Sequence, residues 1–141
     1  MKFRINRVDN SEPDVVDSLS ELHRLTFDSA APLYDFSDGW WWIASYDDLE
    51  VGFAGLSMFQ SSKPTGYLCR SAVVEEFRGN GLQRRFIRAR ERYARKLNLN
   101  RIVTDTRGIH SANNLIQCGY RLYRPKHRWA FKGSNYWEKK L

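Results

Sequence analysis

Two glycines flank an asparagine in the segment EFRGNGLQRRF, residues 76–86, and an arginine precedes them. A strand-like run comes before the segment, and a helical pattern opens near Leu82. A helix start leaves four backbone N–H groups without intrahelical partners and carries partial positive charge. Gly79 and Gly81 let the backbone take positive φ and approach a ligand closely, and Arg78 adds a permanent charge. The combination predicts a cradle for phosphate or pyrophosphate.

The same glycines also suit a plain strand-to-helix turn, in which they only relieve backbone strain. A bare GxG is weak evidence for a ligand site. The segment is not a Walker loop, because no GKS or GKT follows, and it lacks the third glycine of the dinucleotide fingerprint. Both interpretations therefore stay open on these residues alone.

The predicted helix over 82–97 is amphipathic. Its apolar face contains Leu82, Phe86, Ala89, Tyr93 and Leu97. The opposite face contains the arginines 84, 85, 88, 92 and 95. We expect this arginine face to be solvated, and a stripe of phosphate contacts is the alternative. Arg90 projects toward the apolar side, so we expect it to need an acidic partner.

The flanking elements must position the glycine segment. A first strand at 3–8 precedes a helix with Ser11 as its cap and Pro13 in its first turn. Later strands are predicted at 40–46, 50–59, 67–74 and 101–106, a short helix at 110–118, and late strands at YRLY and RWAFKG. The order β-α-β-β-β-α-β-α-β-β, without an internal linker, predicts one α/β domain over 1–141 with a mixed sheet and helices on its faces.

Three pieces occur in a familiar order: VVEEFRGNGLQRRFI, LNLNRIVTDT and NNLIQCGYRLYRP. Over residues 67–124 they resemble the Gcn5-related N-acetyltransferases, the GNAT superfamily. The resemblance implies an α+β fold with a mixed, mostly antiparallel central sheet, helices on both faces and a splayed parallel strand pair. It also implies that an acetyl group passes directly from acetyl-CoA to a primary amine.

The resemblance further implies which residues hold acetyl-CoA. The loop residues that would bind its pyrophosphate are Arg78, Gly79, Asn80, Gly81, Leu82 and Gln83. The preceding strand would pair its backbone with the pantetheine arm at Ser71 and Val73, with Val74 adjacent. The short helix would offer the arm an asparagine, either Asn113 or Asn114.

Leu115 stands where many family members carry a tyrosine that acts as general acid. Acetyl transfer needs a neutral amine and a polarised carbonyl, and an acid helps the thiolate to leave. A bulge in the strand at Val73 or Val74 would free a backbone N–H to polarise the carbonyl. The acid candidates are Tyr120, Tyr123 and Tyr136, and the base candidates are Glu75, Asp105 and His110. We assign the catalytic roles to Tyr120, Glu75 and His110.

The aromatic residues of the middle strands are candidates for the acceptor pocket. They are Trp40, Trp41, Trp42, Tyr46, Phe59 and Tyr67. The tail SNYWEKKL resembles the closing strand of many family members, and its Tyr136 or Trp137 is expected to cover the pocket. Because neighbouring residues of a strand point to opposite faces, we expect at least one tryptophan to lie outside the core.

The formal net charge of +7 over 141 residues favours an anionic partner. A nucleic-acid-binding module is one alternative, but the arginines are not interleaved with aromatic residues and no such motif is present, so we do not expect nucleic acid. A GNAT-like acyl-CoA binder without activity is another. The partners we expect are acetyl-CoA and an amine acceptor, small molecule or protein, and a homodimer is compatible with the sequence.

No apolar run suggests a signal peptide or a membrane span, which predicts a cytoplasmic protein without a membrane partner. Cys69 and Cys118 have no metal-ligand spacing, and His23, His110 and His127 are scattered, so we expect no metal.

Overall fold

The computed structural model describes residues 2–32 and 34–141, and within them seven strands form one sheet in the order β1-β2-β3-β4-β5-β7-β6. The strands are β1 (Phe3–Val8), β2 (Trp40–Tyr46), β3 (Leu49–Phe59), β4 (Thr65–Val73), β5 (Arg101–Thr106), β6 (Arg121–Leu122) and β7 (Asn135–Lys140). The helices are α1 (Pro13–Thr26), α2 (Leu82–Lys96) and α3 (Ile109–Gln117), with a 3-10 turn at Glu75–Phe77. The predicted mixed sheet is confirmed.

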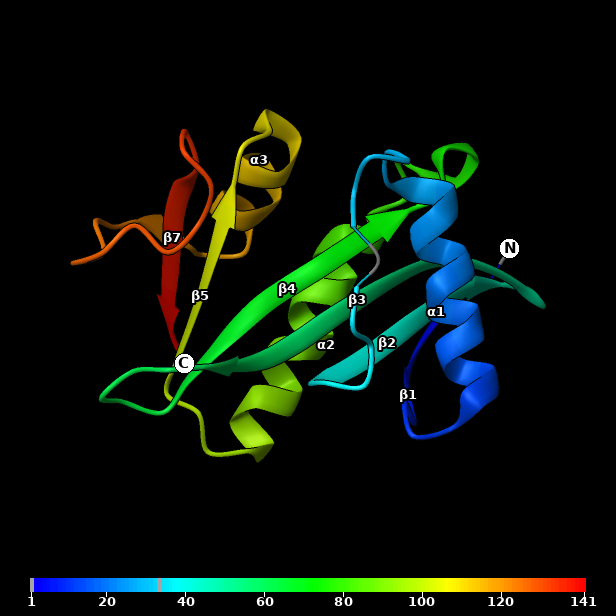
Figure 1. Ribbon diagram of the computed structural model, residues 1–141, viewed down its shortest axis with the longest axis horizontal. Helices are drawn as coiled ribbons and strands as arrows, with labels where there is room; N and C mark the ends of the chain where they lie inside the picture. Colours follow the sequence, from blue (N-terminus) through cyan, green and yellow to red (C-terminus); the bar gives the residue numbers. More distant parts are fainter. Residues whose placement is uncertain (1, 33) are drawn as a thin grey trace.

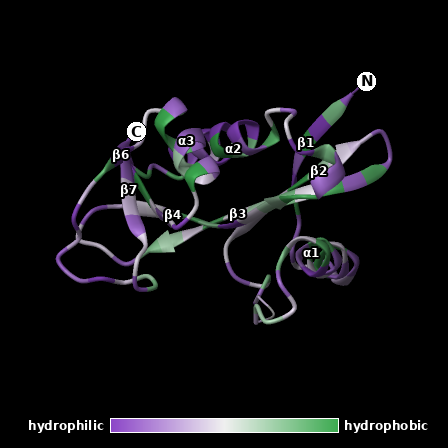
Figure 2. Cartoon of the chain, turned by 90° about the horizontal axis from the view of Figure 1, so that it is seen from above, coloured by the Kyte–Doolittle hydropathy of each residue, from purple (hydrophilic) through white to green (hydrophobic). Residues whose placement is uncertain are grey.

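Helices cover both faces of the sheet, as Figure 2 shows, with α1 on one side and α2 and α3 on the other. Each side has its own apolar cluster. Trp41 belongs to the cluster under α1 and Trp42 to the cluster under α2, and both are buried. Trp40 is only half-buried and packs against the cluster under α2, so one tryptophan of the run lies outside the fully buried core, as expected.

β4 and β5 are parallel neighbours that separate along their length. They pair only from Thr65 with Arg101 to Tyr67 with Val103, and Figure 1 shows them diverging from a common end. Where they part, the Thr104 hydroxyl donates a hydrogen bond to the Leu68 carbonyl over 2.9 Å. The predicted splayed parallel pair is therefore present.

β4 contains a bulge opposite Gly55. Ala54 pairs with Ser71 while Leu56 pairs with Leu68, so β4 has one residue more than β3 over this stretch. A Cβ at Gly55 would lie 2.5 Å from the Cys69 sulfur, which only glycine avoids. The bulge lies earlier in the strand than Val73 and Val74, where the sequence analysis considered one.

The predicted late strand at RWAFKG was wrong, because this segment forms a loop. The closing strand is β7, which lies within the tail SNYWEKKL and inserts between β5 and β6. In that loop the Ala130 N–H donates to the Tyr136 hydroxyl over 3.1 Å, and the Ser134 N–H donates to the Phe131 carbonyl. The loop backbone is satisfied by a side chain and a turn, so it needs no strand partner.

Two local expectations were wrong. The N-cap of α1 is Glu12 without a side-chain bond, and the Ser11 hydroxyl donates to Asp9 instead. The buried Arg90 donates to the carbonyls of Phe86 and Gly55, at 3.1 and 2.9 Å, and not to a carboxylate. Carbonyl dipoles satisfy its buried N–H groups, which is the condition for burying them.

Candidate active site

Two pockets adjoin along β4. The first, here called the loop pocket, has about 930 Å³ and lies between the glycine loop (residues 78–83) and the start of α3. The second, the strand pocket, has about 440 Å³ and lies where β4 and β5 part. The residues that line both are Phe27, Ser71, Gln83, Ser111 and Asn114. Shared walls make the two pockets one continuous groove.

The glycine loop adopts the backbone that the sequence predicted. Gly79 has φ of 83° and Gly81 has φ of 75°, in the left-handed region that favours glycine. A Cβ at either position would meet no atom within 4 Å, so the space beside the loop is open. Gly81 is the N-cap of α2 and no side chain caps that helix start. The first N–H groups of α2 therefore face a site that can accept an anion.

The side chains of the loop are directed away from the helix start. Asn80 donates from Nδ2 to the Phe77 carbonyl over 2.9 Å. Gln83 accepts a hydrogen bond from the Ser71 hydroxyl over 3.1 Å. The first bond ties the loop to the preceding 3-10 turn and the second ties the start of α2 to β4, while no side chain caps the helix start.

Two arginines line the loop pocket. Arg78 donates from Nε to the Val73 carbonyl over 3.1 Å, and Arg84 donates from Nε to Asn114 Oδ1 over 3.2 Å. In the described part of the chain neither forms an ion pair with a carboxylate. Their charges add to the partial positive charge of the helix start, so the pocket favours an anion.

The free edge of β4 presents alternate residues to the groove. The Val74 N–H donates to Val51 on β3 over 2.8 Å, so the backbone groups of Val73 point to the opposite edge. The Arg78 bond to the Val73 carbonyl lies on that edge. Ser71 lies two residues before Val73, with no bulge between them, so its backbone N–H and C=O also point away from β3 toward the groove.

Tyr67 and Asp105 meet in the strand pocket. The Tyr67 hydroxyl donates to Asp105 Oδ1 over 3.0 Å. Burial, and then the Asp105 charge, raise the pKa of Tyr67 above its ordinary value. The phenol therefore keeps its proton at neutral pH, and the Asp105 carboxylate accepts the hydrogen bond from the phenol O–H. The sequence analysis named Asp105 as a base candidate but gave Tyr67 only a lining role, because no local pattern sets the register of two parallel strands.

The structure separates the three residues assigned to catalysis. His110 lies in the first turn of α3 and lines the loop pocket. Glu75 is exposed in the 3-10 turn, and Tyr120 is buried in the core with 4% of its surface exposed. Burial, followed by the Glu91 charge, raises the pKa of Tyr120. Neither Glu75 nor Tyr120 lines a pocket, so only His110 is brought to the groove.

Of the other residues predicted for the site, some line the groove and others do not. Asn113 and Asn114 both line the loop pocket. Of the middle-strand aromatic residues only Tyr67 lines the groove, and the aromatic rings that join it, Phe27 and Phe131, come from loops. Tyr123, Tyr136 and Trp137 line neither pocket.

Among residues 2–32 and 34–141 no three histidine, cysteine or acidic side chains gather as metal ligands would. Within the same ranges no helix has the length and apolar character that crossing a membrane requires.

The fold and the groove define the class of this protein: one mixed sheet whose diverging parallel pair adjoins a positively charged loop at a helix start. The chain belongs to the acetyltransferase (GNAT) family, whose model matches residues 9–120. The resemblance inferred from the sequence is thereby confirmed. Comparison with curated protein sequences found no match.

Solved structures with the same fold span almost the whole chain. A chain of the NatC complex bound to Gag peptide and CoA is 16% identical, with a TM-score of 0.79, and the match covers 100% of this chain and 99% of that one. The GNAT domain of S. lividans PAT is 14% identical, with a TM-score of 0.77, and the match covers 99% of this chain and 90% of that one. The Bacillus subtilis acetyltransferase in complex with CoA is 17% identical, with a TM-score of 0.67 and coverage of 99% of each chain. At these identities the likeness is one of fold.

Proposed function

We propose that this protein binds acetyl-CoA along the groove and transfers the acetyl group directly to a primary amine. The observation that carries the proposal is the continuity of the loop pocket with the strand pocket through five shared residues. An elongated ligand with an anionic end and a reactive end fits such a groove. The CoA in the NatC and B. subtilis structures, which share this fold, supports the choice of ligand.

The pyrophosphate end is assigned to the glycine loop. The backbone N–H groups of residues 79–83 provide the donors, because α2 has no side-chain cap and the glycines leave open space beside them. Arg78, which lines the loop pocket, adds positive charge there. The loop set is Arg78, Gly79, Asn80, Gly81, Leu82 and Gln83.

The pantetheine arm is assigned to the free edge of β4. Ser71 and Val73 present backbone groups to the groove, whereas the N–H of Val74 is already bonded to β3. Asn113 and Asn114 face the arm from α3. An extended amide-containing chain can add to this edge in the way a peptide adds a strand.

The chemistry is assigned to the strand pocket. Asp105 receives the proton of the acceptor ammonium, directly or through one water, and Tyr67 orients the carboxylate by its hydrogen bond. The neutral amine nitrogen forms a bond to the acetyl carbon and the carbon–sulfur bond breaks. The nitrogen then releases its surplus proton to solvent, and the leaving thiolate takes a proton from solvent. A thiol with an ordinary pKa near 8.5 is a tolerable leaving group without an acid. His110 stays a candidate for proton transfer at the loop-pocket end.

Isothermal titration with acetyl-CoA tests the binding. We expect binding at micromolar to sub-millimolar ligand, weakened in Arg78→Gln and unchanged in Arg95→Gln, whose arginine is exposed on the outer face of α2. Absence of any binding at millimolar acetyl-CoA contradicts the proposal. Thiol release with a panel of amines then distinguishes an enzyme from an inactive acyl-CoA binder.

A further inference from the structure

Arg70 stands apart from the arginines that the proposed function uses. It comes from the bulged part of β4 and lines the strand pocket together with Asp105. Its guanidinium carbon lies 5.1 Å from the centre of the Phe27 ring and 5.0 Å from that of Tyr34. Two aromatic rings restrict the guanidinium to one place, which favours a defined binding geometry.

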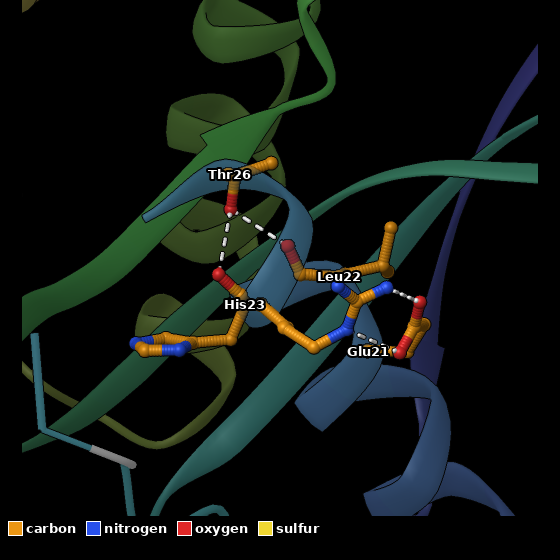
Figure 3. Close-up of polar contacts among 5 residues, drawn as sticks. Glu21, Leu22, His23 and Thr26 are labelled. Atoms are coloured by element: carbon orange, nitrogen blue, oxygen red, sulfur yellow. Dashed lines mark hydrogen bonds and ion pairs between the residues drawn. The ribbon is translucent and has the colours of Figure 1, made fainter. Parts of the chain in front are cut away.

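The hydrogen bonds of Arg70 use one of its nitrogens. Nη1 contacts His23 Nε2 and donates to the Pro32 carbonyl over 3.1 Å. Burial, and then the Arg70 charge, lower the pKa of His23, so its imidazole is neutral at pH 7 and Nε2 accepts. Figure 3 shows the last turn of α1 that presents His23, where the Thr26 hydroxyl donates to the Leu22 carbonyl over 2.7 Å.

The other donors of Arg70 lie on Nε and Nη2. Within residues 2–32 and 34–141 these atoms have no hydrogen-bond partner, and no carboxylate pairs with the guanidinium. The Nε–Nη2 edge is one that binds a carboxylate through two parallel hydrogen bonds. A partly buried cation that neutral groups orient, and that no acidic side chain neutralises, has the features of a binding group for an anion.

A second cation lies just after the neighbouring strand β5. Arg107 follows β5, lines the same pocket and stacks over the Phe131 ring at 5.0 Å. Asp105 is two residues before it. The third arginine of the pocket, Arg90, is buried and already donates to two backbone carbonyls. The strand pocket therefore holds one carboxylate suited to an ammonium group, and Arg70 and Arg107 are its two guanidinium groups suited to an anion.

We propose that the acceptor amine carries a carboxylate, which Arg70 binds through its Nε–Nη2 edge while Asp105 receives the ammonium. Arg107 contributes charge from the other wall. This inference rests on the proposed function, because it deepens the assignment of the same groove. The carboxylate belongs either to a free amino acid or to the acidic first residue of a peptide, and the two sources share this chemistry.

The test compares matched amines in wild-type protein by thiol release from acetyl-CoA. Free amino acids are paired with their carboxamides, and peptides beginning with aspartate or glutamate are paired with those beginning with asparagine or glutamine. We expect kcat/KM to be about 10- to 100-fold higher for the carboxylate member of a pair, mainly through KM. The source of the carboxylate is the free amino acid or the peptide, according to which kind of pair shows the larger ratio of kcat/KM values.

Variants then locate the effect. Arg70→Gln is expected to remove the preference, Arg70→Lys to keep part of it because an ammonium lacks the planar fork, and Arg107→Gln to reduce it less. Arg95→Gln is the matched control and keeps it in full. Thermal unfolding identifies any variant that does not fold, and the wild-type comparison needs no variant.

Equal turnover of carboxylates and carboxamides by a wild-type sample that binds acetyl-CoA overturns the inference and leaves the proposed function standing. A preference that survives in folded Arg70→Gln overturns the assignment to Arg70. A wild-type sample that does not bind acetyl-CoA at all removes the proposed function, and this inference with it.

Discussion

The two halves of the groove are built in different ways. The loop pocket takes its anion-binding groups from the backbone of one short stretch, the glycine loop and the start of α2. The strand pocket takes its groups from side chains of separate segments: Phe27 after α1, Arg70 on β4, Asp105 on β5 and Phe131 in the β6–β7 loop. Under the proposed function, local backbone geometry binds the anionic end of acetyl-CoA, and side chains from distant segments select the acceptor.

The largest effect is expected from the strand pocket, at Asp105. Asp105→Asn keeps the size of the side chain but removes the proton acceptor. We expect kcat to fall by about 100-fold, as loss of a general base does, with acetyl-CoA affinity unchanged. Steady-state kinetics and isothermal titration measure the two quantities.

Asp48→Asn is the control for this change, since Asp48 is exposed in the β2–β3 turn and lies outside both pockets. A kcat for Asp105→Asn equal to that of the control would show that the strand pocket does not carry the chemistry.

A smaller effect is expected from the loop pocket, at Gly81. Alanine at φ of 75° costs about 1–2 kcal/mol in the left-handed region. The backbone relaxes to avoid that strain and the N–H groups of the loop lose their alignment, so we expect acetyl-CoA affinity to fall about tenfold.

Gly133→Ala is a matched control for the loop change. Gly133 has φ of 87°, and a Cβ there would also meet no atom within 4 Å, but it lies outside both pockets. The two variants should lose similar thermal stability and differ in acetyl-CoA affinity. The same affinity loss in both would mean that the loop backbone has no specific part in binding.

The smallest effect concerns the pH dependence of stability at His23. Burial lowers the pKa of this side chain in the folded protein, so the unfolded chain binds the proton more readily. Unfolding therefore takes up protons, and the free energy of unfolding decreases as pH falls below about 6.5. We expect a measurable loss of the free energy of unfolding between pH 7 and pH 5 from this group.

Denaturant unfolding at the two pH values measures that loss. His23→Gln keeps a hydrogen-bond acceptor for Arg70 and should flatten the dependence, whereas His127→Gln, in the exposed loop before β7, should retain it. An unchanged dependence in His23→Gln would contradict the neutral imidazole on which the orientation of Arg70 depends.

Much of the fold was predictable because its signals are local. Two apolar runs at 40–46 and 50–59 flank a turn, and the α2 pattern repeats at helical spacing, so the hairpin and the helix form where expected. The failures are tertiary. RWAFKG has the composition of a strand, but β7 occupies the position beside β5, and the loop is satisfied by Tyr136.

The sequence by itself determined the glycine loop and the helix that follows it. Positive φ at Gly79 and Gly81, and uncapped N–H groups at a helix start, depend on residue type and on neighbours within a few positions. The family followed from the order of these local pieces.

Only the tertiary structure decided which side chains meet where β4 and β5 part. Tyr67 reaches Asp105 from 38 residues away, and Arg70 reaches His23 from 47 residues away. The parallel register and the β4 bulge bring these groups together, and both depend on packing against helices on two faces of the sheet. Tyr120 shows the converse, since the sequence analysis assigned it a catalytic role and the fold buries it in the core.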